Sequence, residues 1–302
     1  MFIVQPRIGL CNQLQSIVKT LLLGIKYNRR VYIDGFQIDL DSNRITDINN
    51  ILDIDRMNHF FEYGNLSVRI DKNIDPNIIS NIEKYKIVDI EYDGIPSSFF
   101  INDKIENTLY KDVLFVGNPV SLSLELSFNI DSNDFNNLYF LLITNIFFKK
   151  TFYDLKDSLK KQLNLTEFTS IHLRIEDDAL IHFSNCYNLT IDKYNETLLN
   201  FYLDKINSTN NKIYICSGIL DYSNKINLGF YNELIKNNQN ICDKRNCFIP
   251  NYIKKNRELI AIIDLIIAID SNSFIGCWVS SFSQIINANC INKSKSTELF
   301  SI

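Results

Sequence analysis

Three polar side chains alternate with apolar ones between Ile171 and Glu176. A strand there would place His172, Arg174 and Glu176 on one face and the apolar residues on the other. Arginine in such a position is suited to phosphate, because its planar guanidinium binds two oxygens at once and stays charged. The alternative is an edge strand, in which Arg174 and Glu176 form a solvated ion pair and His172 is a hydrogen-bonded core histidine.

A glycine turn precedes an expected helix near the amino terminus, in the segment Gly9-Leu10-Cys11-Asn12-Gln13. Asn12 is expected to cap this helix, with Gln15 three residues later as its partner in a capping box. The free N–H groups and positive dipole end of such a helix can bind an anion or a sugar. A capped helix after a strand is also common in α/β proteins that bind nothing there.

A second junction of strand and helix lies in residues 274–283, where the sequence FIGCWVSSFS contains Gly276. Ser281 is expected to cap the helix, with Gln284 as its partner. Hydroxyl and N–H groups would again face an anion. The alternative is a well-capped core helix that packs Phe282 and Ile285 inward.

Two short motifs resemble metal sites. The acidic run 176–178 could bind Mg²⁺, but neighbouring carboxylates on a strand point to opposite sides, and Arg174 already offers positive charge for a phosphate. Cys242 and Cys247 have no second Cys/His pair at zinc spacing. We therefore expect no metal.

Alternating strands and helices must position these residues. The first part begins with a strand at 2–4, apolar residues at helical spacing over 14–25, and a strand at 31–33. The stretch 35–120 has shorter apolar runs, including 86–90 and 113–116, and 135–163 is helical and basic. The second part predicts strands at 170–175, 212–216 and 273–277, and helices at 194–206, 228–236, 258–269 and 281–288. This alternation is typical of α/β domains with a parallel sheet covered on both faces.

Composition narrows the classes of function. The chain has 302 residues, 46% of them hydrophobic, and a formal net charge of −4, so it has no general attraction for nucleic acid. Its most apolar stretch, 259–269, is too short to span a membrane. The amino-terminal residues lack the features of a secretory signal, and the seven cysteines do not suggest a disulfide framework. We therefore expect a cytoplasmic protein.

Together the three polar segments resemble the GDP-fucose-dependent fucosyltransferases, most of all the protein O-fucosyltransferases and their plant relatives. The motifs that carry the resemblance are Gly9-x-x-Asn12-Gln13, His172-x-Arg174 and residues 274–282, with further matches at 47–57, 172–186 and 213–218. The similarity covers nearly the whole chain and is weakest between 65 and 150.

The resemblance implies a GT-B fold, with two Rossmann-like domains that face each other across a cleft. Residues 1–164 would form the domain on the acceptor side, and residues 165–302 would bind the nucleotide sugar. The implied reaction transfers fucose from GDP-fucose to a hydroxyl of a glycan or protein, with inversion and without a metal or other cofactor.

The resemblance also implies roles for single residues. Arg174 would bind the pyrophosphate and His172 would lie beside the nucleotide. The segment Ser280, Ser281 and Phe282 would lie against the diphosphate and nucleoside.

On the other side of the cleft, the turn of Gly9 and Cys11 would bring Asn12 towards the transferred sugar. Relatives often have glycine in place of Cys11. Glu176 is the candidate for the catalytic base that is nearest in sequence to Arg174.

Two alternatives stay open. Relatives often have an acid where this chain has Asn272, so a related GT-B transferase could use another nucleotide sugar. A protein that binds a nucleotide sugar without turnover could also need Arg174.

Overall fold

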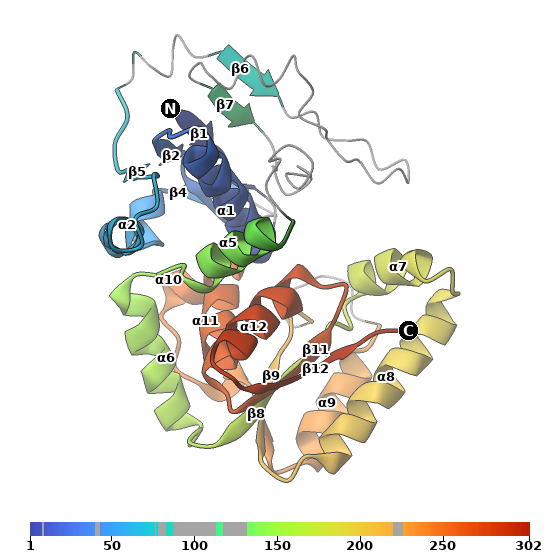
Figure 1. The fold of residues 1–302 in the computed structure, drawn as a ribbon. Coiled ribbons are helices and arrows are strands. Elements are labelled where there is room, and N and C mark those ends of the chain that lie inside the picture. The colour runs from blue at the N-terminus through green and yellow to red at the C-terminus, as the bar shows by residue number, and fades with distance from the viewer. Residues whose placement is uncertain are drawn as a thin grey trace. The chain divides into compact units, whose positions relative to one another are not determined.

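The computed structural model describes residues 1–7, 9–39, 43–75, 77, 83–86, 113–116, 132–219 and 226–302 (Figure 1). Two compact units divide the chain, Met1–Lys150 and Thr151–Ile302. Each unit contains a five-stranded sheet, and every pair of neighbouring strands in both sheets is parallel.

The sheet of the first unit has the strand order β5-β2-β1-β7-β6, and β3 and β4 form a separate antiparallel pair. The elements are β1 (Phe2–Val4), α1 (Leu10–Lys26), β2 (Val31–Ile33), β3 (Phe36–Asp39), β4 (Arg44–Thr46), η1 (Ile48–Asn50), α2 (Ile54–Tyr63), β5 (Ile70–Asp71), β6 (Glu83–Lys86), β7 (Val113–Val116) and α5 (Ser132–Thr144). The predicted strands at 2–4 and 31–33 are confirmed, and the apolar run at 113–116 forms β7. Residues 87–90 of the apolar run at 86–90 lie outside the described residues.

Helix α1 begins directly after the glycine turn. Gly9, with φ −60° and ψ 153°, is the N-cap, so the prediction that Asn12 caps this helix is wrong. The helix starts earlier because Leu10 is itself buried and belongs to the apolar face. Gln13 then joins α1 to β3, since its Nε2 donates to the Gln37 carbonyl at 2.8 Å and its Oε1 accepts from the Gln37 N–H at 2.9 Å.

The sheet of the second unit has the strand order β10-β9-β8-β11-β12. Its elements are α6 (Lys150–Gln162), β8 (Phe168–His172), α7 (Asp177–Cys186), α8 (Ile191–Ser208), β9 (Lys212–Cys216), α9 (Leu228–Asn237), β10 (Ile241–Cys242), η3 (Lys244–Asn246), α10 (Asn251–Lys254), α11 (Arg257–Asp270), β11 (Ser273–Cys277), α12 (Ser281–Asn292) and β12 (Ser296–Phe300). Because β8 pairs with β9 on one side and with β11 on the other, the strand order reverses at β8.

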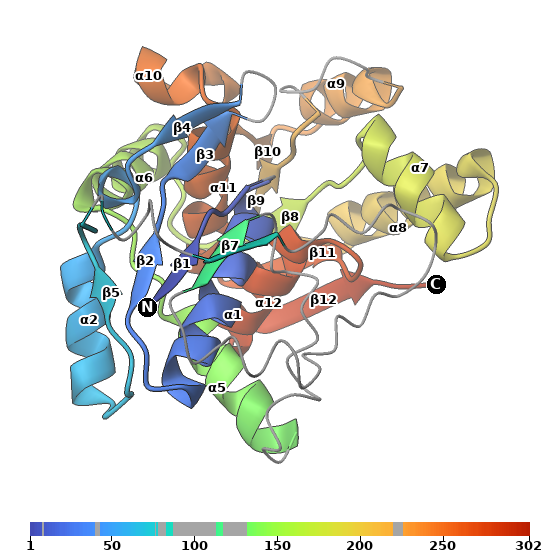
Figure 2. The same ribbon diagram turned by 90° about the horizontal axis from the view of Figure 1, so that it is seen from above.

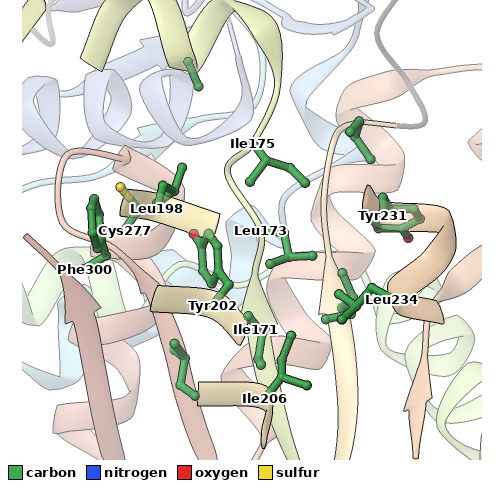
Figure 3. Close-up of a cluster of buried hydrophobic side chains, with 14 of the residues drawn as sticks. Ile171, Leu173, Ile175, Leu198, Tyr202, Ile206, Tyr231, Leu234, Cys277 and Phe300 are labelled. Atoms are coloured by element: carbon green, nitrogen blue, oxygen red, sulfur yellow. The ribbon is translucent and has the colours of Figure 1, made fainter. Parts of the chain in front are cut away.

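Helices cover both faces of this second sheet. Figures 1 and 2 show α8 and α9 on one side of it, and α11 and α12 on the other. Alternate residues of β8 and the segment after it, Ile171, Leu173 and Ile175, are fully buried in one hydrophobic cluster. Figure 3 shows these three side chains in line along the chain, between labelled side chains of α8 and α9. The prediction that these three apolar residues share one buried face is therefore confirmed.

Two predictions about this unit are wrong in detail. The strand predicted at 170–175 is β8 at Phe168–His172, because the chain leaves the sheet after His172 and Glu176 becomes the N-cap of α7. The N-cap of α12 is Ser280 rather than Ser281. The side chain of Gln284 donates to the Trp278 carbonyl at 2.9 Å instead of completing a capping box.

Along the chain, the division between the units follows Lys150, one helix before the predicted border between residues 164 and 165. Helix α6 belongs to the second unit because its contacts are there. Lys156 and Lys160 both form ion pairs with Asp270 at the end of α11, and the ammonium of Lys160 lies 5.4 Å from the ring centroid of Phe168.

We predict that Gly276→Ala lowers the free energy of unfolding by about 1–3 kcal/mol, the usual cost of an overfilled core. A Cβ at Gly276 would lie 2.5 Å from the Ser283 Oγ and 2.7 Å from the Phe274 ring. Gly229→Ala in α9 is the control: a Cβ there meets nothing within 4 Å, so alanine should stabilise the helix by about 0.5–1 kcal/mol. Urea denaturation followed by the fluorescence of Trp278 measures both. Equal stability of the two variants would contradict the prediction.

Candidate functional site

The site lies where β8 and β11 end side by side. These strands are parallel neighbours, so their carboxyl ends meet at the same edge of the sheet. The strand order reverses here, and open α/β sheets bind ligands at such a point. The segment after β8 carries Arg174 and Glu176, and the segment after β11 leads to Ser280 at the start of α12.

His172 joins these two segments. Its ring is buried, and the Nδ1 atom lies 2.8 Å from the Ser283 Oγ. Ser283 Oγ also accepts from the Cys277 N–H at 3.0 Å, so one hydroxyl connects α12 to both strands. The ring of His172 packs against that of Phe282, with 4.7 Å between their centroids.

The imidazole of His172 is uncharged at neutral pH. Its pKa is lowered to about 3, chiefly by burial and in smaller part by the positive charges of Arg174 and Lys244. This histidine therefore forms a neutral wall of the site and does not exchange protons near pH 7.

Two carboxylates hold the guanidinium of Arg174. Nη1 donates to Glu176 Oε2 at 2.8 Å and to Asp178 Oδ1 at 3.3 Å, and Nη2 donates to Asp178 Oδ2 at 2.9 Å. The backbone is fixed as well, because the Tyr202 hydroxyl donates to the His172 carbonyl at 2.7 Å and accepts from the backbone N–H of Arg174 at 3.3 Å. Since 19% of its side chain is exposed, Arg174 lies at the surface of the site.

Glu176 is buried, with 2% of its side chain exposed. Besides the bond to Arg174, its Oε1 accepts from the Gly218 N–H at 2.6 Å and lies 3.3 Å from the Ser217 hydroxyl. Both oxygens are thus engaged in fixing other groups. The role of catalytic base stays a prediction, and the geometry fits a residue that positions Arg174.

Ser280 and Ser281 begin α12 at the same edge. Ser280 is buried, and its carbonyl accepts from the Gln284 N–H at 3.0 Å as the first bond of the helix. The N–H groups of the first turn therefore point to the carboxyl ends of β8 and β11, and the helix dipole adds partial positive charge there.

The predicted site residues of the first unit form a separate group at the end of β1. Gly9 caps α1, Cys11 is buried, and Asn12 lies half-buried in the first turn. The Asn12 carbonyl accepts from the Ser16 hydroxyl at 2.8 Å.

In the second unit, the structure places six predicted residues at one edge of the sheet: His172, Arg174, Glu176, Ser280, Ser281 and Phe282.

Asn272 lies away from the site. Its Oδ1 accepts from the Phe168 N–H at 3.0 Å, and its own N–H donates to the Phe168 carbonyl at 2.9 Å. These bonds join the amino ends of β8 and β11, and Arg174 follows their carboxyl ends.

Sequence reasoning missed several polar groups near this edge. The sequence shows Asp178 only as part of the acidic run 176–178, and its ion pair with Arg174 forms because the chain turns into α7 between the two residues. No pattern in the sequence pointed to Ser283 or Gly218, since their roles depend on contacts distant in sequence.

The first unit also has a polar residue that sequence reasoning missed. Arg7 follows β1 and is half-buried; burial lowers its pKa, and the negative charge of Asp34 opposes the shift.

A buried ion pair was also missed. Lys244 follows β10, and its Nζ lies 2.5 Å from Asp264 Oδ2 in the middle of α11. The hydroxyl of Tyr214 on β9 donates to the other oxygen of Asp264 at 2.7 Å. Burial and the negative charge of Asp264 raise the pKa of Tyr214 well above its usual value. Lys244, Asp264 and Tyr214 thus form a buried polar cluster between α11 and the strands β9 and β10.

Other predictions concern metals, thiols and membranes. Among the described residues, no group of three His, Cys, Asp or Glu side chains is arranged to hold a metal ion. Cys242 and Cys247 are thiols in this structure. Within the same residues, no helix has the length and apolar character needed to cross a membrane.

The two units, each with a five-stranded parallel sheet, define the class of fold. The chain has the GT-B fold, as predicted. Solved structures with this fold include POFUT1 in complex with GDP-fucose, with a TM-score of 0.65 and 12% identity over 100% of this chain and 97% of POFUT1. The NodZ α-1,6-fucosyltransferase co-crystallised with GDP is also similar, with a TM-score of 0.52 and 13% identity over 95% and 91% of the two chains. No protein-family model and no curated protein matches the sequence. The predicted resemblance is thus confirmed for the fold.

We predict that His172 makes the second unit sensitive to acid. A folded-state pKa of about 3 means that only the unfolded chain takes up this proton as the pH falls below about 6.5. The fold should lose about 2 kcal/mol of stability between pH 7 and pH 5 from this group alone. His172→Gln should lack this loss, whereas His182→Gln, a change of an exposed residue on α7, should keep it. Equal pH dependence of both variants in urea denaturation would contradict the account.

Proposed function

We propose that this chain is a glycosyltransferase that transfers fucose from GDP-fucose to the hydroxyl group of an acceptor. The observation that carries the proposal is the position of Arg174 where strand order reverses in the second sheet. The similarity of fold to POFUT1 in complex with GDP-fucose supports the choice of donor. The sequence motifs at 9–13, 172–174 and 274–282 support it independently.

The chemistry requires positive charge near the leaving group. Breaking the bond between fucose and phosphate leaves a diphosphate with growing negative charge and a sugar with oxocarbenium character. Groups that bind the leaving oxygens more tightly as this charge develops lower the barrier. Arg174 offers a cation, and the first turn of α12 offers N–H groups at the same edge.

The other residues of the site have supporting roles in this proposal. His172 and Phe282 form an uncharged surface beside the nucleotide, and Ser280 and Ser281 bind the diphosphate through hydroxyl and N–H groups. Glu176 positions Arg174. We propose that residues 165–302 bind the donor.

The acceptor side of the proposal rests on the first unit. Within the predicted domain of residues 1–164, this unit would bind a glycan or protein acceptor, and Gly9, Cys11 and Asn12 would approach the transferred sugar. We further propose that the reaction inverts the configuration at the sugar and uses no metal. Arg174 and the dipole of α12 would supply the positive charge that a divalent ion supplies elsewhere.

A comparison of donors tests this function. Thermal-shift measurements with GDP, UDP, ADP and CMP sugars should show stabilisation by the GDP sugars alone, since a ligand stabilises by RT ln(1 + [L]/Kd). Release of fucose from GDP-fucose, followed by NMR, should begin with the inverted anomer and continue in EDTA. Tight GDP binding without release would favour a non-catalytic binder. Stabilisation by another nucleotide sugar alone would contradict the choice of donor.

We predict that Arg174→Ala abolishes transfer and weakens GDP binding. A charge-assisted hydrogen-bonded contact contributes about 1.5–3 kcal/mol, or a factor of about 10–150 in Kd. Arg174→Lys should recover only part of this, because an ammonium lacks the planar pair of donors. Arg245→Ala, at an arginine bound to Asp243, is the matched control and should leave the Kd unchanged. Near-normal turnover of Arg174→Ala would remove Arg174 from this role.

A further inference from the structure

The charges around Arg174 do not favour an anion as they stand. One guanidinium faces two carboxylates, at 2.8 Å for Glu176 and 2.9 Å for Asp178, so the formal charge of the three groups is −1. The carboxylates also occupy N–H groups that a diphosphate needs. Asp178 binds as a pair, with one oxygen on Nη1 and the other on Nη2. A diphosphate would use the same paired geometry.

The two carboxylates differ in how easily they can leave. Glu176 has 2% of its side chain exposed and is also bound to the Gly218 N–H. Separating it from Arg174 would leave a buried charge with a lost partner, which is costly. Asp178 has 55% of its side chain exposed and lies in the first turn of α7. Water and the positive end of the helix can therefore stabilise its carboxylate after release.

We propose that Asp178 competes, within the molecule, for the phosphate-binding N–H groups of Arg174. The carboxylate of Asp178 leaves the guanidinium when the diphosphate of a nucleotide sugar binds, and it returns when the diphosphate departs. Glu176 stays in place in both states and keeps the guanidinium aimed at the edge of the sheet. The inference rests on the proposed function and adds the residue that limits donor affinity and favours release of the diphosphate product.

Calorimetric titration with GDP and with inorganic pyrophosphate tests this inference. Asp178→Asn keeps the size of the side chain and removes its charge, so it should lower the Kd for both ligands about fivefold, as expected for loss of one competing surface ion pair. Asp178→Ser should act in the same direction. Asp192→Asn is the matched control, because Asp192 is an exposed acid in the first turn of the neighbouring helix α8 and should leave Kd unchanged.

A double variant separates direct competition from a general effect of charge. In an Arg174→Ala background, Asp178→Asn should restore no binding, because the gain requires the guanidinium. Restored binding there, or an unchanged or raised Kd for Asp178→Asn alone, would overturn the inference. Failure of every variant to bind either ligand would overturn it as well. Tighter pyrophosphate binding by Asp178→Asn with no GDP binding by any variant would support the competition and refute the proposed donor.

Discussion

The carboxylate of Glu176 joins the ends of two neighbouring strands. One oxygen binds the guanidinium of Arg174 after β8, and the other accepts from the N–H of Gly218 after β9. Because the group is buried, both bonds act with little competition from water. The geometry of the site depends on this contact, since it fixes the one arginine that follows β8 at the edge where the strand order reverses. Catalysis of the proposed kind needs such a cation held in place before the reaction begins.

A second set of contacts fixes the opposite wall. Ser283 on α12 binds the backbone of Cys277 and the ring of His172, so a helix and two strands share one hydroxyl. Gly276 makes this possible, because any side chain there would collide with Ser283 and Phe274. Burial keeps His172 neutral, so the positive charge beside this wall comes from Arg174 and not from the imidazole. A neutral, rigid surface beside a fixed cation suits a nucleotide with a charged diphosphate and an uncharged base.

The sequence was most informative where periodicity was strong. The helices α1, α8 and α11 were predictable from their apolar spacing, and the strands β1, β9 and β11 from short apolar runs that are almost completely buried. Short elements such as β10 and β12, and the hairpin of β3 and β4, were not predicted, since their pairing depends on residues distant in sequence. The end of β8 was misplaced for a similar reason, because it is set by pairing with β9, which stops at His172 and Cys216. His172 and Arg174 were identifiable from their alternation with buried residues, whereas the partners Asp178 and Ser283 became visible only in the folded chain.

A crystal structure of the protein with bound GDP tests the central claim most directly. The account predicts the diphosphate at the carboxyl ends of β8 and β11, with both terminal nitrogens of Arg174 in hydrogen-bond distance of phosphate oxygens and Glu176 still on the Gly218 N–H. A diphosphate bound elsewhere, with Arg174 still paired to both of its carboxylates, would contradict it.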